Sequence, residues 1–216
     1  MHGLIHSFLR SVRWRTNRWF GYQSLYFYST FTATPQISRE DYVFVEVDKE
    51  AAERHNQDLH DNGNPDIPID RLEAGHRCFG FAEPRGDIVS WGWVSAPPSG
   101  KNIMVPWEGT LALGLSGPIA YIWDCHTLPR ARGRGLYRDN LLTISRLMLE
   151  GGSESMLIYC NARNTASMRG IGAAGFRRDS VLSILRAGPV YLLLEKGANP
   201  IIAWSGKAVR RRRKLA

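Results

Sequence analysis

The segment from Tyr121 to Tyr137 predicts a strand that ends at a proline and leads through a basic, glycine-containing turn directly into a helix. A helix N-terminus presents free backbone N–H groups and the positive end of the helix dipole. Gly133 and Gly135 allow the turn to approach a bound anion closely, and Arg132 and Arg134 add positive charge. The segment therefore predicts a site for a ligand that carries phosphate or pyrophosphate.

The rest of the sequence alternates between patterns typical of strands and patterns typical of helices. We expect strands at 42–47, 77–82, 88–95, 119–128, 156–160, 180–185 and 190–194, and helices at 49–60, 70–74, 136–149 and 164–174. The turn at 83–87 predicts a hairpin, and the proline- and glycine-rich stretch 96–118 predicts a loop. Residues 24–31 predict an extra strand or a wrapping arm. This order of elements predicts an α/β fold without internal repeats.

The length of 216 residues and a hydrophobic content of 44% fit one ordinary domain with a substantial core. The three cysteines, Cys78, Cys125 and Cys160, are widely spaced and form no CxxC motif. This pattern indicates buried thiols in a reducing compartment and gives no sign of a metal site. No apolar run approaches the roughly 18 residues that a membrane-spanning helix needs.

The net charge of +8 is concentrated at the two ends of the chain. Residues 1–39 contain five arginines and no acidic residue, and residues 207–216 contain six basic residues, which leaves a charge of −3 for the middle. We therefore expect a basic N-terminal arm (1–39), a central domain (40–197) and a basic C-terminal tail (198–216). The arginine run at 210–213 predicts a disordered tail, with binding to anionic lipid or nucleic acid as the alternative.

The first residues of the arm show an apolar stripe at helical spacing, with the arginines largely off it: Leu4, Ile5, Phe8, Leu9 and Val12. Three interpretations stay open. The segment is a helix packed on the domain, a basic amphipathic helix on an anionic membrane or partner surface, or an organelle transit peptide.

Two motifs in this order of elements resemble the GNAT superfamily of acyl-CoA N-acyltransferases, over roughly residues 40–195. The first is a strand and a proline, followed by Arg-x-x-Gly-x-Gly/Ala at the start of a helix. The second is Asn-x-x-Ser/Ala followed by Gly-Phe, which matches Asn164, Ser167 and Gly175-Phe176. The resemblance implies a central mixed, mostly antiparallel sheet with splayed middle strands, flanked by helices.

The first motif fits this sequence in two registers, one beginning at Arg130 and one at Arg132. We prefer Arg132, because that register places Asp124 and Thr127 where similar sequences have an acid and a β-branched residue on the strand. In the preferred register, Tyr137 stands where the family usually has a small residue.

The resemblance implies acetyl-CoA as cosubstrate and no metal. The backbone from Gly133 to Arg138 would bind the pyrophosphate, the backbone at 125–127 would pair with the pantetheine arm and polarise the thioester, and Asn164 would contact pantetheine. The cosubstrate-binding residues implied in this way are Cys125, His126, Thr127, Arg132, Gly133, Arg134, Gly135, Leu136, Tyr137, Arg138, Asn164 and Ser167.

The implied reaction is a direct attack of an amine on the thioester, and it needs proton transfers. The residues that usually carry out these transfers in the family are absent from this sequence. Ile171 stands where the family often has a tyrosine acid, and Tyr159 stands where some members have a carboxylate. The candidates are Asp124, His126 and Tyr159, with Asp124 ranked first because strand alternation places it on the face of His126. The structural alternatives are an ion pair for Asp124, a satisfied polar contact for His126 and core packing for Tyr159.

The acceptor is not written in the sequence, and a small-molecule amine and a protein amino group are equally admissible. The basic ends favour an anionic membrane surface as a further partner, and nucleic acid is the weakest option. We expect a cytoplasmic monomer or homodimer, with a peripheral position at the membrane as the variant. The alternative function is a non-catalytic acyl-CoA-binding module with a degenerate active site.

Overall fold

The structure is a computed structural model that describes residues 20–32, 37–59, 65–97, 102–106, 112–195, 201–204 and 208–210. Its strands are β1 (Phe20–Thr30), β2 (Val43–Val47), β3 (Arg77–Ala82), β4 (Ile88–Ser95), β5 (Asn102–Pro106), β6 (Ala112–Ser116), β7 (Ile119–Thr127), β8 (Ser155–Asn161), β9 (Arg177–Ala187), β10 (Val190–Glu195), β11 (Ile201–Trp204) and β12 (Ala208–Arg210). Its helices are α2 (Lys49–Leu59), α3 (Ile69–Glu73), α4 (Leu136–Glu150), α5 (Thr165–Ala173) and the short 3-10 helix η2 (Pro129–Ala131).

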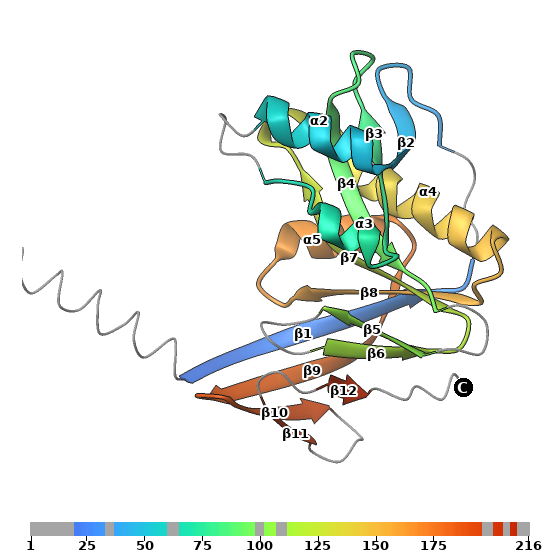
Figure 1. The fold of residues 1–216 in the computed structure, drawn as a ribbon. Helices are drawn as coiled ribbons and strands as arrows, with labels where there is room; N and C mark the ends of the chain where they lie inside the picture. Colours follow the sequence, from blue (N-terminus) through green and yellow to red (C-terminus); the bar gives the residue numbers. More distant parts are fainter. Residues whose placement is uncertain are drawn as a thin grey trace, which may run out of the picture.

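Nine of the described strands form one mixed sheet in the order β11-β10-β9-β1-β8-β7-β4-β3-β2 (Figure 1). Within this sheet, β7 and β8 are the parallel pair, and the other neighbouring strands of the described chain pair antiparallel. A second, three-stranded sheet has the order β12-β6-β5. The expected mixed, mostly antiparallel α/β architecture is therefore confirmed.

Most elements expected from the sequence are confirmed with ends within three residues: β2, β3, β4, β7, β8, β9, β10 and helices α2, α3, α4 and α5. The hairpin expected at 83–87 is also confirmed, because the Glu83 N–H donates to the Asp87 carbonyl over 2.9 Å. These elements carry strong local signals, namely regular apolar periodicity and glycine or proline at their ends.

One expectation about the elements was wrong. The stretch 96–118, expected to be a loop, contains β5 and β6. Two more strands without a sequence prediction, β11 and β12, lie in the segment 198–216, whose arginine run is described only at Arg210. These short strands form because distant partners supply their hydrogen bonds: β11 pairs with β10, and β12 pairs with β6 from about 95 residues earlier in the chain. Local sequence patterns do not record such pairing.

Residues 20–30 of the expected N-terminal arm form an inner strand of the large sheet. Strand β1 lies between β8 and β9 and pairs antiparallel with both. The strand alternative for residues 24–31 is therefore confirmed. The apolar stripe at residues 4–12 lies outside the described residues. Among the described helices, none has the length and apolar character needed to cross a membrane.

The large sheet is packed on both faces. On one face α4 packs on β3, β4, β7 and β8, with α5 in contact with α4 (Figure 1). Leu141 and Ile144 of α4 and Ile171 of α5 are fully buried in this layer. On the other face, α2 and α3 pack against a second cluster that includes Trp91 and Trp93 of β4. The alternation of side chains along each strand divides the apolar residues between these two layers.

A bulge in β7 opens the centre of the sheet. Trp93 of β4 pairs with Trp123 and Trp91 pairs with His126, so Asp124 and Cys125 together face the single residue Gly92. Asp124 has φ 45°, the one positive φ among the described non-glycine residues. The pairing of β7 with β8 ends at Ile122 and Ile158, although both strands continue. The strands therefore part and expose backbone groups on two facing edges.

The bulge predicts a specific requirement for glycine at position 92. A Cβ atom there would lie 2.9 Å from the Cys125 Sγ atom, closer than packed side chains approach. We expect Gly92→Ala to lower the free energy of unfolding by about 1–3 kcal/mol, measured by chemical denaturation.

The double variant Gly92→Ala/Cys125→Ala should be more stable than Gly92→Ala alone, because it removes the clashing sulfur. Gly172→Ala is the matched control, since a Cβ at that helical position meets nothing within 4 Å. If Gly92→Ala behaves like Gly172→Ala, the close approach of the Cys125 sulfur to position 92 is wrong.

Candidate functional site

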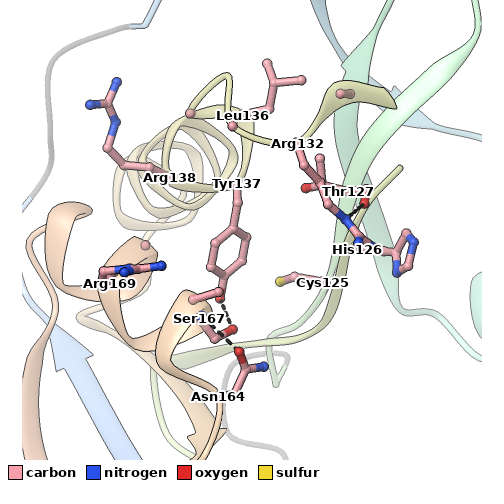
Figure 2. Close-up of a pocket in the computed structure, with 15 residues that line it drawn as sticks. Cys125, His126, Thr127, Arg132, Leu136, Tyr137, Arg138, Asn164, Ser167 and Arg169 are labelled. Carbon is pink, nitrogen blue, oxygen red and sulfur yellow. Dashed lines mark hydrogen bonds between the residues drawn. The ribbon is translucent and has the colours of Figure 1, made fainter. Parts of the chain in front are cut away.

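A cavity of about 580 Å³ lies between the end of β7, the N-terminus of α4 and α5 (Figure 2). It brings together all of the predicted cosubstrate-binding residues except Arg134. The lining residues are Cys125, His126, Thr127, Ala131, Arg132, Gly133, Gly135, Leu136, Tyr137, Arg138, Asn164, Ala166, Ser167, Arg169 and Gly170.

The N-terminus of α4 supplies free backbone donors to this cavity. Gly135 caps the helix with φ 79°, and Gly133 has φ 77°, both in the left-handed region that glycine adopts without strain. The first intrahelical bond is that from the Asp139 N–H to the Gly135 carbonyl, at 3.1 Å. The N–H groups of the preceding residues, Leu136 to Arg138, therefore have no helical acceptor. This arrangement is suited to an anion.

The arginines of the turn have different roles. The Arg132 Nε donates to the Thr127 carbonyl over 3.1 Å and ties the turn to the end of β7. Arg134, predicted to bind the cosubstrate, does not line the cavity and instead donates to the Tyr42 hydroxyl over 2.6 Å. Arg134 therefore anchors the turn to the segment that leads into β2.

Tyr137 fills the space between α4 and α5. Its hydroxyl accepts a hydrogen bond from the Ser167 Oγ over 3.2 Å, and a Cβ on Gly170 would lie 2.4 Å from the Tyr137 ring. Glycine at position 170 thus makes room for this ring. Burial raises the pKa of the Tyr137 phenol above its ordinary value, so the hydroxyl remains protonated at neutral pH.

Asn164 begins α5 and lies at the opposite end of the cavity from the turn (Figure 2). Its side-chain oxygen accepts a hydrogen bond from the Ser167 N–H over 3.1 Å, which caps the helix. Asn164 and Ser167 are therefore held in place by the helix start itself.

The end of β7 directs successive side chains to different surroundings. The Cys125 thiol has a pKa raised by burial, and the Thr127 hydroxyl is hydrogen-bonded to Ser90 over 2.9 Å. The His126 ring packs on Trp91 with centroids 4.9 Å apart, and its buried Nε2 has no hydrogen-bond partner among the described residues. Burial and the charge of Arg132 lower the pKa of His126, so it is neutral at pH 7.

Asp124 does not line the cavity. Its half-exposed carboxylate forms an ion pair with Arg71 of α3, whose guanidinium lies 4.6 Å from the centre of the Trp123 ring. The ion pair considered as the structural alternative is therefore present. Asp124 and the His126 ring lie towards the α2 and α3 side of the sheet, where Arg71 and Trp91 pack.

Tyr159 of β8 also lies outside the cavity lining. Its ring stacks on Tyr121 with centroids 6.2 Å apart and packs against Phe27 at 5.5 Å. The core-packing alternative is thus present in the structure. Tyr159 follows Ile158, the last β8 residue paired with β7, so it stands where the two strands part.

No protein-family model matches the sequence, and a search of curated proteins gives no significant match. Solved structures do match. A GNAT-family acetyltransferase from Novosphingobium aromaticivorans has a TM-score of 0.53 at 15% identity, over 76% of this chain and 63% of its own. A GCN5-related N-acetyltransferase from Sphaerobacter thermophilus has a TM-score of 0.52 at 12% identity, over 86% of this chain and 56% of its own.

The chain has the GNAT fold. It spans less than two thirds of the length of either acetyltransferase. At these identities the similarity concerns the fold alone. The parting of β7 from β8 in the middle of the sheet is the splay of the middle strands that the sequence resemblance implied.

Several cavity residues of this GNAT fold were missed from the sequence. Ala166, Arg169 and Gly170 lie at i, i+3 and i+4 on α5, so they share one helix face. The same helical spacing, counted onward from Asn164 and Ser167, could have predicted that these residues line the cavity. Ala131 of η2 carries no comparable signal, because a small residue in a turn has many uses.

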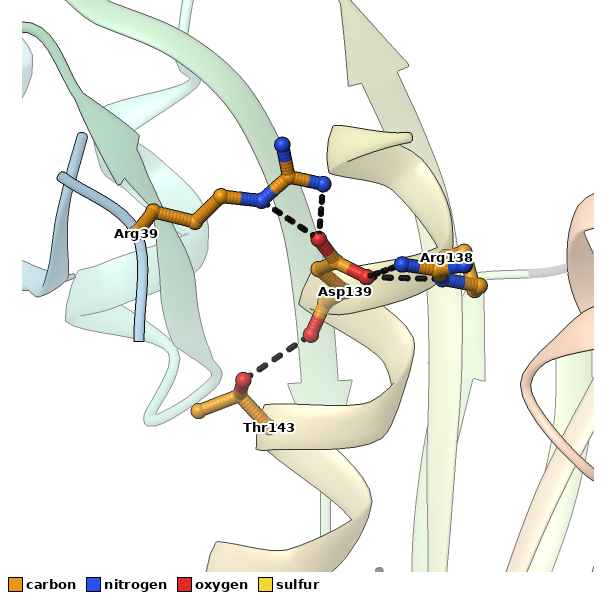
Figure 3. Close-up of polar contacts among 4 residues, drawn as sticks. All are labelled: Arg39, Arg138, Asp139 and Thr143. Carbon is orange, nitrogen blue, oxygen red and sulfur yellow. Dashed lines mark hydrogen bonds and ion pairs between the residues drawn. The ribbon is translucent and has the colours of Figure 1, made fainter. Parts of the chain in front are cut away.

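Asp139 is a second missed feature, directly behind the turn (Figure 3). Its carboxylate is 1% exposed and lies between two guanidinium groups. One oxygen accepts a hydrogen bond from the Arg39 Nε at 2.7 Å. The other accepts one from the Arg138 Nε at 2.7 Å and forms an ion pair with an Arg138 terminal nitrogen, also at 2.7 Å. One negative charge thus holds two positive charges at the N-terminus of α4.

The described part of the chain contains no group of three or more His, Cys, Asp or Glu side chains that could hold a metal ion. The three cysteines are free thiols.

The surroundings of His126 predict its titration. We expect its imidazole to titrate below the ordinary value of 6.5 in an NMR pH titration, because burial and Arg132 both disfavour the charged form. Arg132→Ala should raise this pKa, whereas Arg163→Ala, an exposed arginine outside the cavity, should leave it unchanged. A wild-type pKa at or above 6.5 would contradict the described environment.

Proposed function

We propose that this chain transfers an acyl group, most simply acetyl, from CoA to a primary amine by direct attack on the thioester. The observation that carries the proposal is the continuity of one cavity. The same cavity is lined by the donor-rich N-terminus of α4 and by the end of β7, where β7 leaves β8. A ligand with a pyrophosphate at one end and a reactive group at the other fits this arrangement.

In this proposal the pyrophosphate accepts hydrogen bonds from the N–H groups of Leu136 to Arg138, with Arg132 beside it. The pantetheine arm runs along Cys125 to Thr127 and pairs with the exposed backbone edge of β7 as an added strand does. The thioester then lies between the parted ends of β7 and β8. A backbone N–H of the bulged strand polarises its carbonyl.

The reaction joins the amine nitrogen to the acyl carbon and breaks the carbon–sulfur bond, giving an amide and free CoA. The amine must lose a proton to attack, and the departing thiolate must gain one. Holding both reactants in one cleft supplies a large part of the rate enhancement. Proton transfer by a positioned side chain adds roughly 10²- to 10⁴-fold.

The candidate catalytic residues can be given distinct roles. His126 accepts the proton of the ammonium group, because its lowered pKa keeps the imidazole neutral and its Nε2 has no partner among the described residues. Asp124 orients the incoming amine from the α3 side of β7, where its carboxylate is half exposed. Tyr159 stands at the parting of the strands and forms a wall of the acceptor side.

The acceptor is a small-molecule or protein amine that approaches from the side of α2 and α3, opposite the packed face of α4. A membrane-proximal amine is favoured if the basic ends of the chain bind an anionic surface. These ends lie largely outside the described residues.

A non-catalytic CoA-binding module is the second candidate. The fully buried Ile171 and the packed Tyr159 favour it, because neither side chain takes part in proton transfer to or from a bound substrate as the family's residues at these positions do. The module and the enzyme share the cosubstrate site and differ only in turnover.

The cosubstrate site is tested by Gly135→Glu, measured by isothermal titration with CoA. The substitution places bulk and negative charge at the cap of α4, and we expect CoA affinity to fall by about 100-fold or more.

Gly75→Glu is the control, because Gly75 also has a positive φ, of 85°, but lies in the turn after α3. It should carry a similar backbone strain and keep CoA affinity. Equal CoA affinities in the wild type and in Gly135→Glu would contradict binding of the pyrophosphate at this turn.

Turnover is tested by thiol release from acetyl-CoA with a panel of small amines, amino sugars and peptides. We expect release with at least one amine, and Asp124→Asn should lower kcat by about 10²-fold while CoA affinity stays within about twofold.

The control is Asp87→Asn in the β3–β4 turn, which removes another arginine-paired carboxylate and should not affect kcat. Tight CoA binding without release on any amine would establish the module instead.

A further inference from the structure

The cavity holds more positive charge than a pyrophosphate requires. Beyond the turn and Arg132, two more guanidinium groups line it, Arg138 from α4 and Arg169 from α5. Figure 2 shows both of them on the side of Tyr137 away from Cys125, so they do not face the strand edge. They lie in the part of the cavity away from the proposed position of the pantetheine arm.

Arg138 is held in a fixed direction. Its Nε donates to one oxygen of Asp139 at 2.7 Å, and a terminal nitrogen forms an ion pair with the same oxygen at 2.7 Å (Figure 3). The Asp139 side chain is 1% exposed. Arg39 occupies the other Asp139 oxygen, so the three side chains together carry a net charge of +1. A guanidinium held in this way loses little side-chain entropy when it binds an anion.

Arg169 lines the cavity, and no acidic side chain among the described residues pairs with it. It has no hydrogen-bond or ion-pair partner among the described residues, and its side chain is exposed. Helices α4 and α5 contact each other, so Arg138 and Arg169 approach the cavity from neighbouring elements. Two arginines from two helices match a phosphate monoester, whose oxygens accept from more than one direction.

We propose that Arg138 and Arg169 bind the 3′-phosphate of CoA, and that Asp139 is the positioning residue for Arg138. The inference rests on the proposed function, because it requires CoA in this cavity. CoA carries its second phosphate group on the ribose, apart from the pyrophosphate, and this dianionic group is the part of the ligand that the turn leaves without a partner. The site thus distinguishes CoA from ligands that have the pyrophosphate alone.

The test compares CoA with 3′-dephospho-CoA by isothermal titration calorimetry. The wild-type chain should bind CoA at least about tenfold more tightly. Arg138→Ala and Arg169→Ala should each weaken CoA binding by about tenfold and leave binding of 3′-dephospho-CoA within about twofold. Arg163→Ala, an exposed arginine just before α5, should change neither.

Asp139→Asn should lower the ratio of the two affinities, an effect that a purely structural role would not produce. The two arginine variants alter exposed side chains and test the proposal even if Asp139→Asn does not fold. Equal binding of both ligands by the wild type would overturn this inference and leave the proposed function in place. Absence of binding by either ligand would overturn both.

Discussion

The parting of β7 from β8 is the constraint on which the rest of the site depends. A bulge places Asp124 and Cys125 opposite Gly92, twists the strand and ends its pairing with β8 at Ile122. Beyond that point two strand edges face each other without joining. A sheet that closed there would leave no room for an extended ligand and no backbone donors to hold one. Gly92 permits the bulge because any side chain would meet the Cys125 sulfur.

The bulge also separates two kinds of chemistry. Cys125 lies against the layer of α4 and α5 with Tyr137, whereas Asp124 and His126 lie against the layer of α2 and α3. The turn before α4 and Asn164 belong to the first layer, and the candidate proton-transfer residues belong to the second. An acyl-CoA would therefore reach the opening between the strands from one face of the sheet, and an amine would reach it from the other face.

The sequence predicted the elements that have strong local signals and the cavity residues that follow from the turn and from Asn164. It could not predict β12, because its partner β6 lies far away in the chain. It placed Arg134 in the cavity, although the Tyr42 hydroxyl binds that side chain elsewhere. Asp139 was missed for a similar reason, since its partner Arg39 precedes it by 100 residues. Each of these features depends on a tertiary contact that local periodicity does not encode.

The most direct measurement of the central claim is a crystal structure of the chain with CoA bound. We expect the pyrophosphate on the N–H groups of Leu136 to Arg138, and the sulfur between the ends of β7 and β8, near Cys125 and Tyr159. CoA bound on another surface, or a sulfur kept out of the opening by the Tyr137 ring, would contradict the proposed site.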